Sequence, residues 1–171
     1  MSEHCVAYQR KSLYLLLTIP MIGMYVAIAA LLWQANIIAF AGYCALFVMV
    51  AVCQSYVCVY WQCPYVGRFA PCVGGFCLPS SQLARYLKGV KRSERAYTVA
   101  VSLATLALLG IFVLPVPFLY QRSVVYLLVY VGIVVAYAAS FLWLICPACG
   151  TRHVCPGGQA STKLRGMVAR K

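Results

Sequence analysis

The chain has 171 residues, of which 64% are hydrophobic and only 9% are charged. Soluble globular domains carry about 25% charged residues, so this composition argues against a water-soluble fold. The formal net charge is +12, but the sequence contains no recognisable nucleic-acid-binding module. We interpret the excess of Lys and Arg as a determinant of membrane topology that also attracts anionic lipids.

Four apolar segments without charged residues predict four transmembrane helices. The segments are 12–33, 37–61, 96–120 and 123–145. Each is longer than the ~20 residues that a helix needs to cross ~30 Å of hydrocarbon. The first segment follows two basic residues, as the core of a signal peptide does, but it is too long for one, and no cleavage site followed by a polar domain comes after it. We therefore expect residues 1–171 to form one all-α integral membrane domain.

The basic residues predict the orientation of these helices. With both termini and the loop 62–95 on one side of the membrane, every Lys and Arg except Arg122 lies on that side. Because loops rich in Lys and Arg stay in the cytoplasm, we predict a multi-pass protein of the cell membrane with both termini cytoplasmic.

The two halves of the chain repeat each other at a shift of 83 residues, the separation of Cys63 and Cys146. The same shift places Cys72 on Cys155, and both segments read C-P-x-x-G-x-x-x-x-C-x-G-G. Such a repeat indicates a duplicated unit, here a helical hairpin followed by a cysteine-rich arm. The two units are 12–78 and 95–161. Because each unit crosses the membrane twice, both arms are expected on the cytoplasmic side, related by a pseudo-twofold axis along the membrane normal.

The segments that join and follow the two units are rich in basic residues. In 79–95, apolar residues recur at helical spacing, and basic residues occupy other positions. The apolar residues are Leu83, Tyr86, Leu87 and Val90. We predict an amphipathic helix that lies on the inner leaflet and anchors the first arm; docking of a protein partner is the alternative. The chain ends in a basic tail, 162–171.

Small residues at four-residue spacing predict close packing between the transmembrane helices. They are Gly23 and Ala27, Ala100 and Ala104, and Gly132, Ala136 and Ser140.

The acid–base inventory restricts the chemistry that the chain can perform. It contains no Asp, and its only carboxylate side chains are Glu3 and Glu94, so it has no carboxylate pair for acid–base catalysis or for a hard metal ion. No charged residue or His lies inside a predicted span, which argues against a proton-coupled transporter or an ion pump. Both His residues, His4 and His153, lie outside the spans, so a haem held between helices by two His is excluded as well. These absences favour a protein that is not an enzyme.

Six of the ten cysteines lie in the two arms, and we predict that they bind metal. They are Cys63, Cys72, Cys77, Cys146, Cys149 and Cys155. The run from Cys146 to Gly150 is a C-P-x-C-G knuckle, which resembles, over five residues, the half-sites of zinc ribbons and of rubredoxin-type iron sites. In a reducing cytoplasm such a cluster indicates metal before disulfides, with intracellular disulfides as the alternative in a hyperthermophile. Zinc is the expected metal, and iron or an iron–sulfur cluster is the alternative.

The repeat leaves two arrangements of these ligands open. A twofold axis between the arms would bring four sulfur atoms around one tetrahedral centre. The four belong to Cys63, Cys72, Cys146 and Cys155. Alternatively, each arm forms a site of its own: the second arm uses its three cysteines with His153, and the three cysteines of the first arm are completed from elsewhere. We favour the shared centre, because each unit carries its own Cys-Pro segment.

Three further cysteines lie in the second predicted helix. They are Cys44, Cys53 and Cys58. Buried cysteines behave as small apolar residues, so packing is their expected role. The alternative is a relay that passes a soft metal ion such as Cu(I) toward the arms, assisted by three methionines. The methionines are Met21, Met24 and Met49.

These features favour a non-catalytic membrane subunit or scaffold. Its metal-bound arms would dock a protein partner, in a larger membrane complex or a homo-oligomer, beside an anionic inner leaflet. The first alternative is a redox protein that uses iron, an iron–sulfur cluster or thiol–disulfide cycling. The second is soft-metal transport. No nucleic-acid partner is expected.

Overall fold

The computed structural model describes residues 11–63, 66, 75–148 and 156–168. Every regular element in these ranges is helical, and four helical stretches are long and apolar enough to cross a membrane. They are Lys11–Ala35, Ile37–Tyr60, Glu94–Arg122 and Val124–Ile145. The prediction of an all-α protein with four helices of transmembrane length is therefore confirmed, and each stretch ends within two residues of the predicted position.

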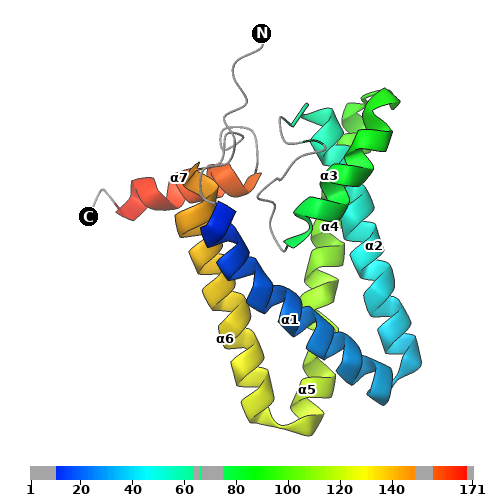
Figure 1. The fold of residues 1–171 in the computed structure, drawn as a ribbon, viewed down its shortest axis with the longest axis vertical. Coiled ribbons are helices and arrows are strands. Elements are labelled where there is room, and N and C mark those ends of the chain that lie inside the picture. The colour runs from blue at the N-terminus through cyan, green and yellow to red at the C-terminus, as the bar shows by residue number, and fades with distance from the viewer. Residues whose placement is uncertain (1–10, 64–65, 67–74, 149–155, 169–171) are drawn as a thin grey trace.

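Seven α-helices and three short helical turns make up the described part of the chain (Figure 1). The α-helices are α1 (Lys11–Ala35), α2 (Ile37–Tyr60), α3 (Cys77–Tyr86), α4 (Glu94–Val113), α5 (Val116–Arg122), α6 (Val124–Ser140) and α7 (Pro156–Val168). The turns are the 3-10 turn η2 (Leu87–Gly89), the π-helical turn η3 (Phe141–Ile145) and the 3-10 turn η4 (Cys146–Ala148). Since η3 directly continues α6, the two form one membrane-length stretch.

Single polar residues make the two hairpin turns. Asn36 separates α1 from α2, and its side chain accepts hydrogen bonds from the backbone N–H groups of Ile38 (2.8 Å) and Ala39 (3.2 Å). Ser123 separates α5 from α6, and its hydroxyl accepts from the N–H of Val125 at 3.2 Å. Both residues have extended backbone angles, so each acts as an N-cap that starts the helix after it.

Prolines explain the break between α4 and α5. Pro115 follows the end of α4 and precedes the start of α5. It has no N–H to donate, and its ring crowds the preceding turn, so it weakens the regular α-helix, which is interrupted here. Pro117 lies in the first turn of α5, where a backbone N–H needs no partner within the helix.

The four long stretches form a ring around a common core. α1 packs on α2, α2 on α4, α5 on α6, and α6 on α1. We call the end of the bundle that holds Cys63 and Cys146 the cysteine end, because α2 and the α6–η3 stretch both finish there. The opposite end, with the α1–α2 and α5–α6 turns, is the hairpin end. α1 and α6 lie close together at the cysteine end and separate toward the hairpin end (Figure 1).

One face of α1 supplies much of the core. Its buried residues recur at alternating spacings of four and three, which keeps them on a single side of the helix. They are Tyr14, Thr18, Met21, Tyr25, Ile28 and Leu32. The stripe meets α6 and η3, where Tyr14 and Phe141 form an edge-to-face pair with ring centroids 6.1 Å apart. The outer faces of the helices expose large apolar side chains, as expected for helices that face lipid.

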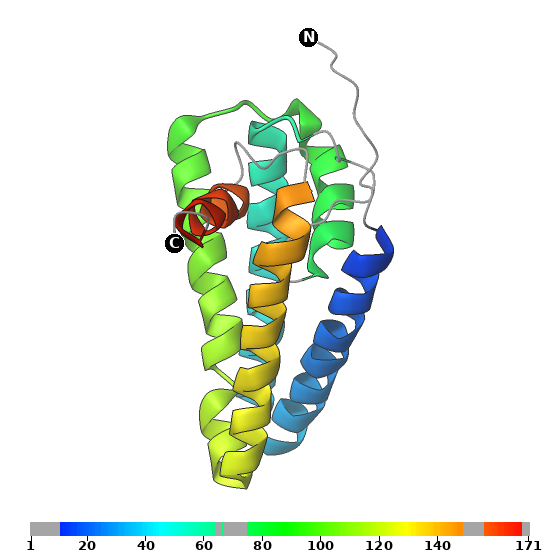
Figure 2. The ribbon, with the colours of Figure 1, turned by 90° about the vertical axis from the view of Figure 1, so that its left-hand side faces the viewer.

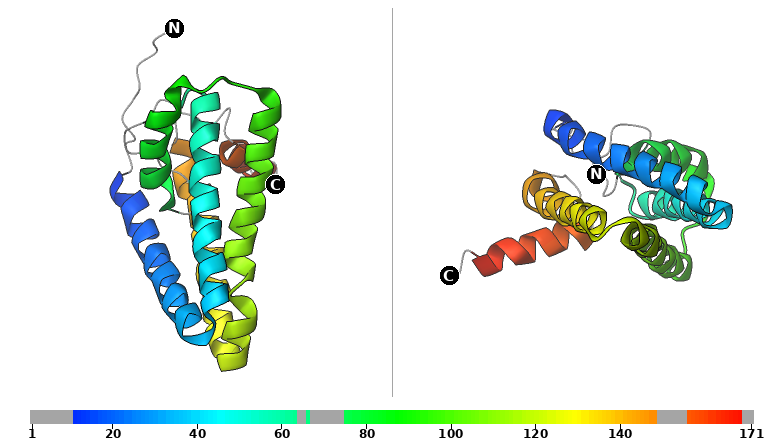
Figure 3. Two further views of the ribbon diagram at one scale, coloured as in Figure 1. Left: turned by 90° about the vertical axis from the view of Figure 1, so that its right-hand side faces the viewer. Right: turned by 90° about the horizontal axis from the view of Figure 1, so that it is seen from below.

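The segment predicted as one amphipathic helix over 79–95 is divided in the structure. α3 ends at Tyr86, η2 ends at Gly89, and α4 begins at Glu94. α3 packs against α2 and runs along the bundle rather than across its end (Figures 2 and 3).

Small buried residues bring α3 against α2. Ser80, Ser81 and Ala84 are all buried, and the hydroxyl of Ser55 on α2 donates to the carbonyl oxygen of Ser80 at 3.0 Å. Small side chains let two helices approach closely in an apolar environment. The hydropathy pattern of 79–95 predicted that Leu83 lies on the apolar face, but it did not predict that the two serines are buried against α2.

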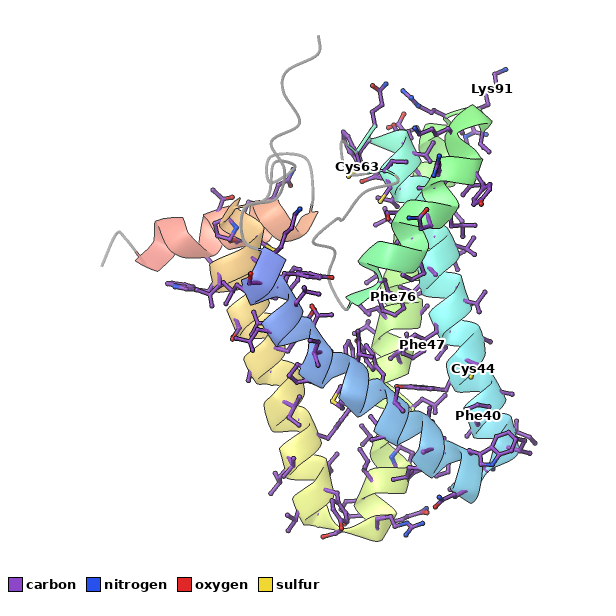
Figure 4. The ribbon with its side chains drawn as sticks, in the orientation of Figure 1. Phe40, Cys44, Phe47, Cys63, Phe76 and Lys91 are labelled. Atoms are coloured by element: carbon purple, nitrogen blue, oxygen red, sulfur yellow. The ribbon has the colours of Figure 1, made fainter. Side chains whose placement is uncertain are left out.

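α3 begins deep inside the bundle. The ring of Phe76, the residue before α3, lies with its centroid 5.2 Å from that of Phe47 and 6.3 Å from that of Tyr25. Phe47 is thirteen residues from the end of α2 at Tyr60, which corresponds to about 20 Å along the helix. α2 ends at Tyr60, three residues before Cys63. The chain lies beside Phe47 again at Phe76, and α3 then runs back toward the cysteine end (Figure 4). Residues 75–86 of this connection therefore lie back inside the bundle, alongside α2.

The predicted small-residue contacts are only partly present. Ala100 is buried and Ala104 is half-buried on α4, but Gly23 and Gly132 face outward, and a Cβ added to either would meet nothing within 4 Å. Close approach of α2 and α4 instead involves Gly110, where an added Cβ would lie 3.0 Å from Cδ1 of Leu46.

Candidate functional site

Cys63 lies at the cysteine end because a helix cap turns the chain there. Gln62 has a left-handed backbone (φ 49°) and donates its N–H to the carbonyl oxygen of Val59 at 3.2 Å, while Cys63 donates its N–H to the carbonyl oxygen of Cys58 at 2.9 Å. This pair of bonds is a Schellman motif, which satisfies the last carbonyls of a helix. Cys63 is half-buried and packs against the core, so its position is fixed by the end of α2.

Cys146 lies at the same end for a similar reason. It follows the π-helical turn η3 and donates its backbone N–H to the carbonyl oxygen of Phe141. π-Helical turns are rare and occur often at functional sites. The Cys146 side chain is 6% exposed and belongs to the core.

The two backbone hydrogen bonds occupy equivalent positions of the sequence repeat. The N–H of Cys63 bonds to the carbonyl of Cys58, and the N–H of Cys146 bonds to the carbonyl of Phe141, so each bond spans five residues. The two donors are 83 residues apart in the sequence, and so are the two acceptors. The two Cys-Pro segments thus start at the same end of the bundle, the first after the Schellman cap of α2 and the second after the π-helical turn η3 (Figure 1).

A serine hydroxyl attaches α7 to the helix that precedes the second arm. Ser161 is buried and donates to the carbonyl oxygen of Leu142 in η3 at 2.7 Å. α7 contacts both η3 and η4, so the helix that follows the second arm is held against the turns that lead into it. In the same way, the hydroxyl of Ser55 links α2 to α3 through its hydrogen bond to Ser80.

The charged side chains of the described ranges gather at the cysteine end, with one exception. Those at this end are Lys11, Arg85, Lys88, Lys91, Arg92, Glu94, Arg95 and Lys163, all exposed. Arg122, at the end of α5, lies at the hairpin end. The basic connection before α4 is fastened to α2, because Ser93 donates its N–H to the hydroxyl of Tyr56 at 3.2 Å, and that hydroxyl donates to the carbonyl oxygen of Lys91 at 3.4 Å. The cysteine end is therefore strongly positive.

The other predicted ligands are placed only in part. Cys77 is the first residue of α3 and follows Phe76, so its backbone lies deeper in the bundle than Cys63. Cys72, Cys149, Cys155 and His153 lie outside the described residues. Within the described ranges no three Cys, His, Asp or Glu residues lie close enough to hold a metal ion together. Of the predicted site, the structure thus describes mainly Cys63 and Cys146, the first cysteine of each arm.

The cysteines of α2 do not gather into a site within the described ranges. Cys44 is exposed on the outer face of the helix, whereas Cys53 and Cys58 are half-buried. Met49 is exposed, while Met21 is buried on α1. The soft-metal relay stays a prediction.

Sequence reasoning missed a group of polar side chains at the centre of the bundle. Tyr25, Tyr43, Tyr130 and Tyr137 are all buried. Tyr130 donates to the carbonyl oxygen of Phe112 at 3.0 Å. The spacing of seven between Tyr130 and Tyr137 was the available signal, because residues seven apart lie on one face of a helix.

Three of the central hydroxyl groups lack a hydrogen-bond partner among the described residues. They belong to Thr18, Tyr25 and Tyr43. A buried polar group without a partner costs about 1–3 kcal/mol, which an ordered water molecule can offset. Among the described residues, the interior thus holds buried hydroxyl groups but no charged side chain.

Searches against protein-family models, curated protein sequences and solved structures find no match to this chain.

Proposed function

We propose that this chain is a non-catalytic subunit or scaffold of a membrane complex. In this proposal the two cysteine arms together hold a zinc ion on the cytoplasmic side of the membrane and present a docking surface to a protein partner. The observation that carries the proposal is the matching pair of backbone hydrogen bonds at Cys63 and Cys146, which start both Cys-Pro segments from the same end of the bundle.

The ring of helices supports the duplication on which a shared site depends. A twofold axis along the bundle would exchange α1 with α4 and α5, and α2 with the α6–η3 stretch. It would thereby convert the contact of α1 with α2 into that of α5 with α6, and the contact of α2 with α4 into that of α6 with α1. All four contacts are present, but α2 packs on α4 far more extensively than α6 packs on α1.

The charge of the cysteine end suits a thiolate-bound metal ion. Four thiolates around one Zn²⁺ carry a net charge of −2, and nearby positive groups reduce the cost of that charge. Arg92 lies beside the residue that precedes Cys63: with the amide of Gln62 turned to face it, the Arg92 guanidinium donates to the amide oxygen.

The same positive end supports the cytoplasmic orientation and a surface for partners. By the positive-inside rule the cysteine end faces the cytoplasm, where it lies beside anionic lipids. Tyr86 is 84% exposed and stands next to Arg85 and Lys88. Exposed Tyr and Arg side chains such as Tyr86 and Arg85 are enriched where proteins bind one another.

The test is the metal content of the purified protein and of three single variants. Elemental analysis should find one zinc per wild-type chain, and both Cys63→Ser and Cys146→Ser should lose it. Cys44→Ser is the matched control, because Cys44 is exposed on the outer face of α2, and it should keep its zinc. Full retention of zinc by Cys63→Ser would exclude the shared centre, and its retention by both arm variants would remove the proposal.

The same sample distinguishes the redox alternative. An iron or iron–sulfur site absorbs visible light, whereas zinc thiolates do not, and a thiol-cycling protein would contain a reducible disulfide and no metal.

A further inference from the structure

A groove runs between α1, α5 and α6 in the hairpin half of the bundle. Its volume is about 450 Å³, within the range of ~300–1,000 Å³ that is usual for ligand sites. The lining comes from α1 between Met24 and Gln34, from Leu119 and Arg122 of α5, and from α6 between Tyr126 and Ile133. Its residues Ala27 and Val129 are exposed, whereas Ile28 and Tyr130 are buried. The groove is therefore open at the side, toward the lipid that surrounds the helices.

The polarity of the groove changes along its length. Gln34, Arg122 and Tyr126 lie at the hairpin end, where α1 and α5 finish and α6 begins. Deeper in the groove the lining is apolar except for Tyr130, whose hydroxyl is already bonded to a backbone carbonyl. Exposed Trp33 and Tyr126 mark the level of the lipid headgroups, because aromatic residues collect at that interface. A molecule with a polar head and an apolar tail matches this gradient.

The length of the groove equals the depth of one leaflet. Met24 and Gln34 are ten residues apart on α1, which corresponds to about 15 Å. The hydrocarbon of a bilayer is ~30 Å thick, so one leaflet contributes about half of that. A chain that starts at Gln34 and ends at Met24 would cross a single leaflet.

The positive charge of Arg122 favours an anionic group at the polar end of the groove. It is the one charged side chain at the hairpin end among the described residues, and the described carboxylate, Glu94, begins α4 at the other end. A guanidinium group binds phosphate through two parallel hydrogen bonds. We propose that the groove binds a phospholipid of the adjoining leaflet, with its phosphate on Arg122 and one acyl chain between α1 and α6.

A quinone fits the groove less well than a phospholipid does. The stretch Val124–Ile145 separates the polar end of the groove from the cysteine end, and at 1.5 Å per residue it is about 33 Å long. The redox-active head of a quinone at Arg122 would therefore be remote from the thiols of the arms. Binding of a phosphate requires only the positive charge of Arg122.

Native mass spectrometry of the detergent-purified full chain tests the proposal. The probes are a palmitoyl-oleoyl phosphatidylglycerol and a diacylglycerol with the same two acyl chains. We expect the wild-type protein to retain the phospholipid in preference to the diacylglycerol. Arg122→Gln should weaken phospholipid binding about tenfold, because it removes a charge-assisted contact, and Arg122→Lys should weaken it less.

A second variant tests the acyl-chain part of the groove without changing its charge. Ala27→Phe places a ring in the opening and should abolish retention of the phospholipid. Ala45→Phe, at an exposed position of α2 outside the groove, is its control, and Arg85→Gln, at the cysteine end, is the control for Arg122→Gln. Both controls should bind as the wild type does, and circular dichroism should show equal helix content in all variants.

The outcomes that would overturn the proposal are distinct. Equal retention by Ala27→Phe and Ala45→Phe would remove the groove as the site. Equal binding by Arg122→Gln and Arg85→Gln, or equal binding of phospholipid and diacylglycerol, would remove the phosphate contact. None of these variants changes a cysteine, so the result is independent of the metal site.

Discussion

Replacing Phe76 by Ala tests whether α3 begins inside the bundle. The Phe76 side chain is 4% exposed, and its ring packs against those of Phe47 and Tyr25. Truncation to Ala removes roughly 100 Å³, which at about 24 cal/mol per Å³ of cavity costs about 2.4 kcal/mol. The lost aromatic pairs add about 0.5–1.5 kcal/mol. The transfer part of the usual penalty is small here, because lipid is as apolar as the core. We expect the free energy of unfolding to fall by about 3 kcal/mol.

Tyr86→Ala provides the control for this measurement. Tyr86 is an aromatic residue at the other end of α3, but it is 84% exposed, so its removal should change the stability by less than about 0.5 kcal/mol. Both variants are unfolded by titration with sodium dodecyl sulfate in mixed micelles and followed by circular dichroism. Hydrogen exchange should also accelerate in α3 of Phe76→Ala. If the two variants unfold at the same detergent fraction, and α3 stays equally protected, the placement of Phe76 inside the bundle is wrong.

Three further predictions concern packing, capping and orientation. Gly110→Leu should destabilise the bundle by about 1–3 kcal/mol, because an added Cβ already lies 3.0 Å from Leu46, whereas Gly23→Leu should change little; equal stabilities in the same titration would contradict the contact. Asn36→Ala should cost about 1 kcal/mol by removing the N-cap of α2, and an unchanged unfolding midpoint would show that the cap is dispensable. After chelation of any metal, an impermeant maleimide should label the arm thiols in inverted membranes but not in intact cells; labelling of intact cells would reverse the proposed orientation.

The long helices could be predicted because composition alone determines them. The spans need only uninterrupted apolar residues of sufficient length, and the structure ends them within two residues of the predicted positions. The turns were also encoded locally, since Asn36 and Ser123 are strong N-cap residues and Pro115 breaks the helix before it.

The path of the loop 62–95 could not be predicted, because its deciding contacts are made by residues that hydropathy does not distinguish. Ser80 and Ser81 look like surface residues in the sequence, yet they are buried against α2. Gly23 and Gly110 are equally small, and only their neighbours in space decide that Gly110 lies at a helix contact. Patterns along one helix show which face is apolar, but not which partner covers it.

The candidate site could be predicted from the sequence only in part. The repeat of the Cys-Pro segments is visible in the sequence, and the common end of the bundle for Cys63 and Cys146 follows from two membrane crossings per unit. The Schellman cap before Cys63 and the π-helical turn before Cys146 were not foreseen, because a hydrogen bond that spans five residues leaves no clear sequence signal. The groove at Arg122 was missed as well, because it depends on the divergence of α1 from α6.

X-ray absorption at the zinc edge of the purified wild-type protein would show whether the cysteines of both arms share one metal ion. We expect one zinc per chain, surrounded by four sulfur atoms at ~2.3 Å, and loss of this signal in Cys63→Ser. A protein without zinc, whose arm cysteines are joined as disulfides with sulfur atoms ~2.05 Å apart, would contradict this expectation.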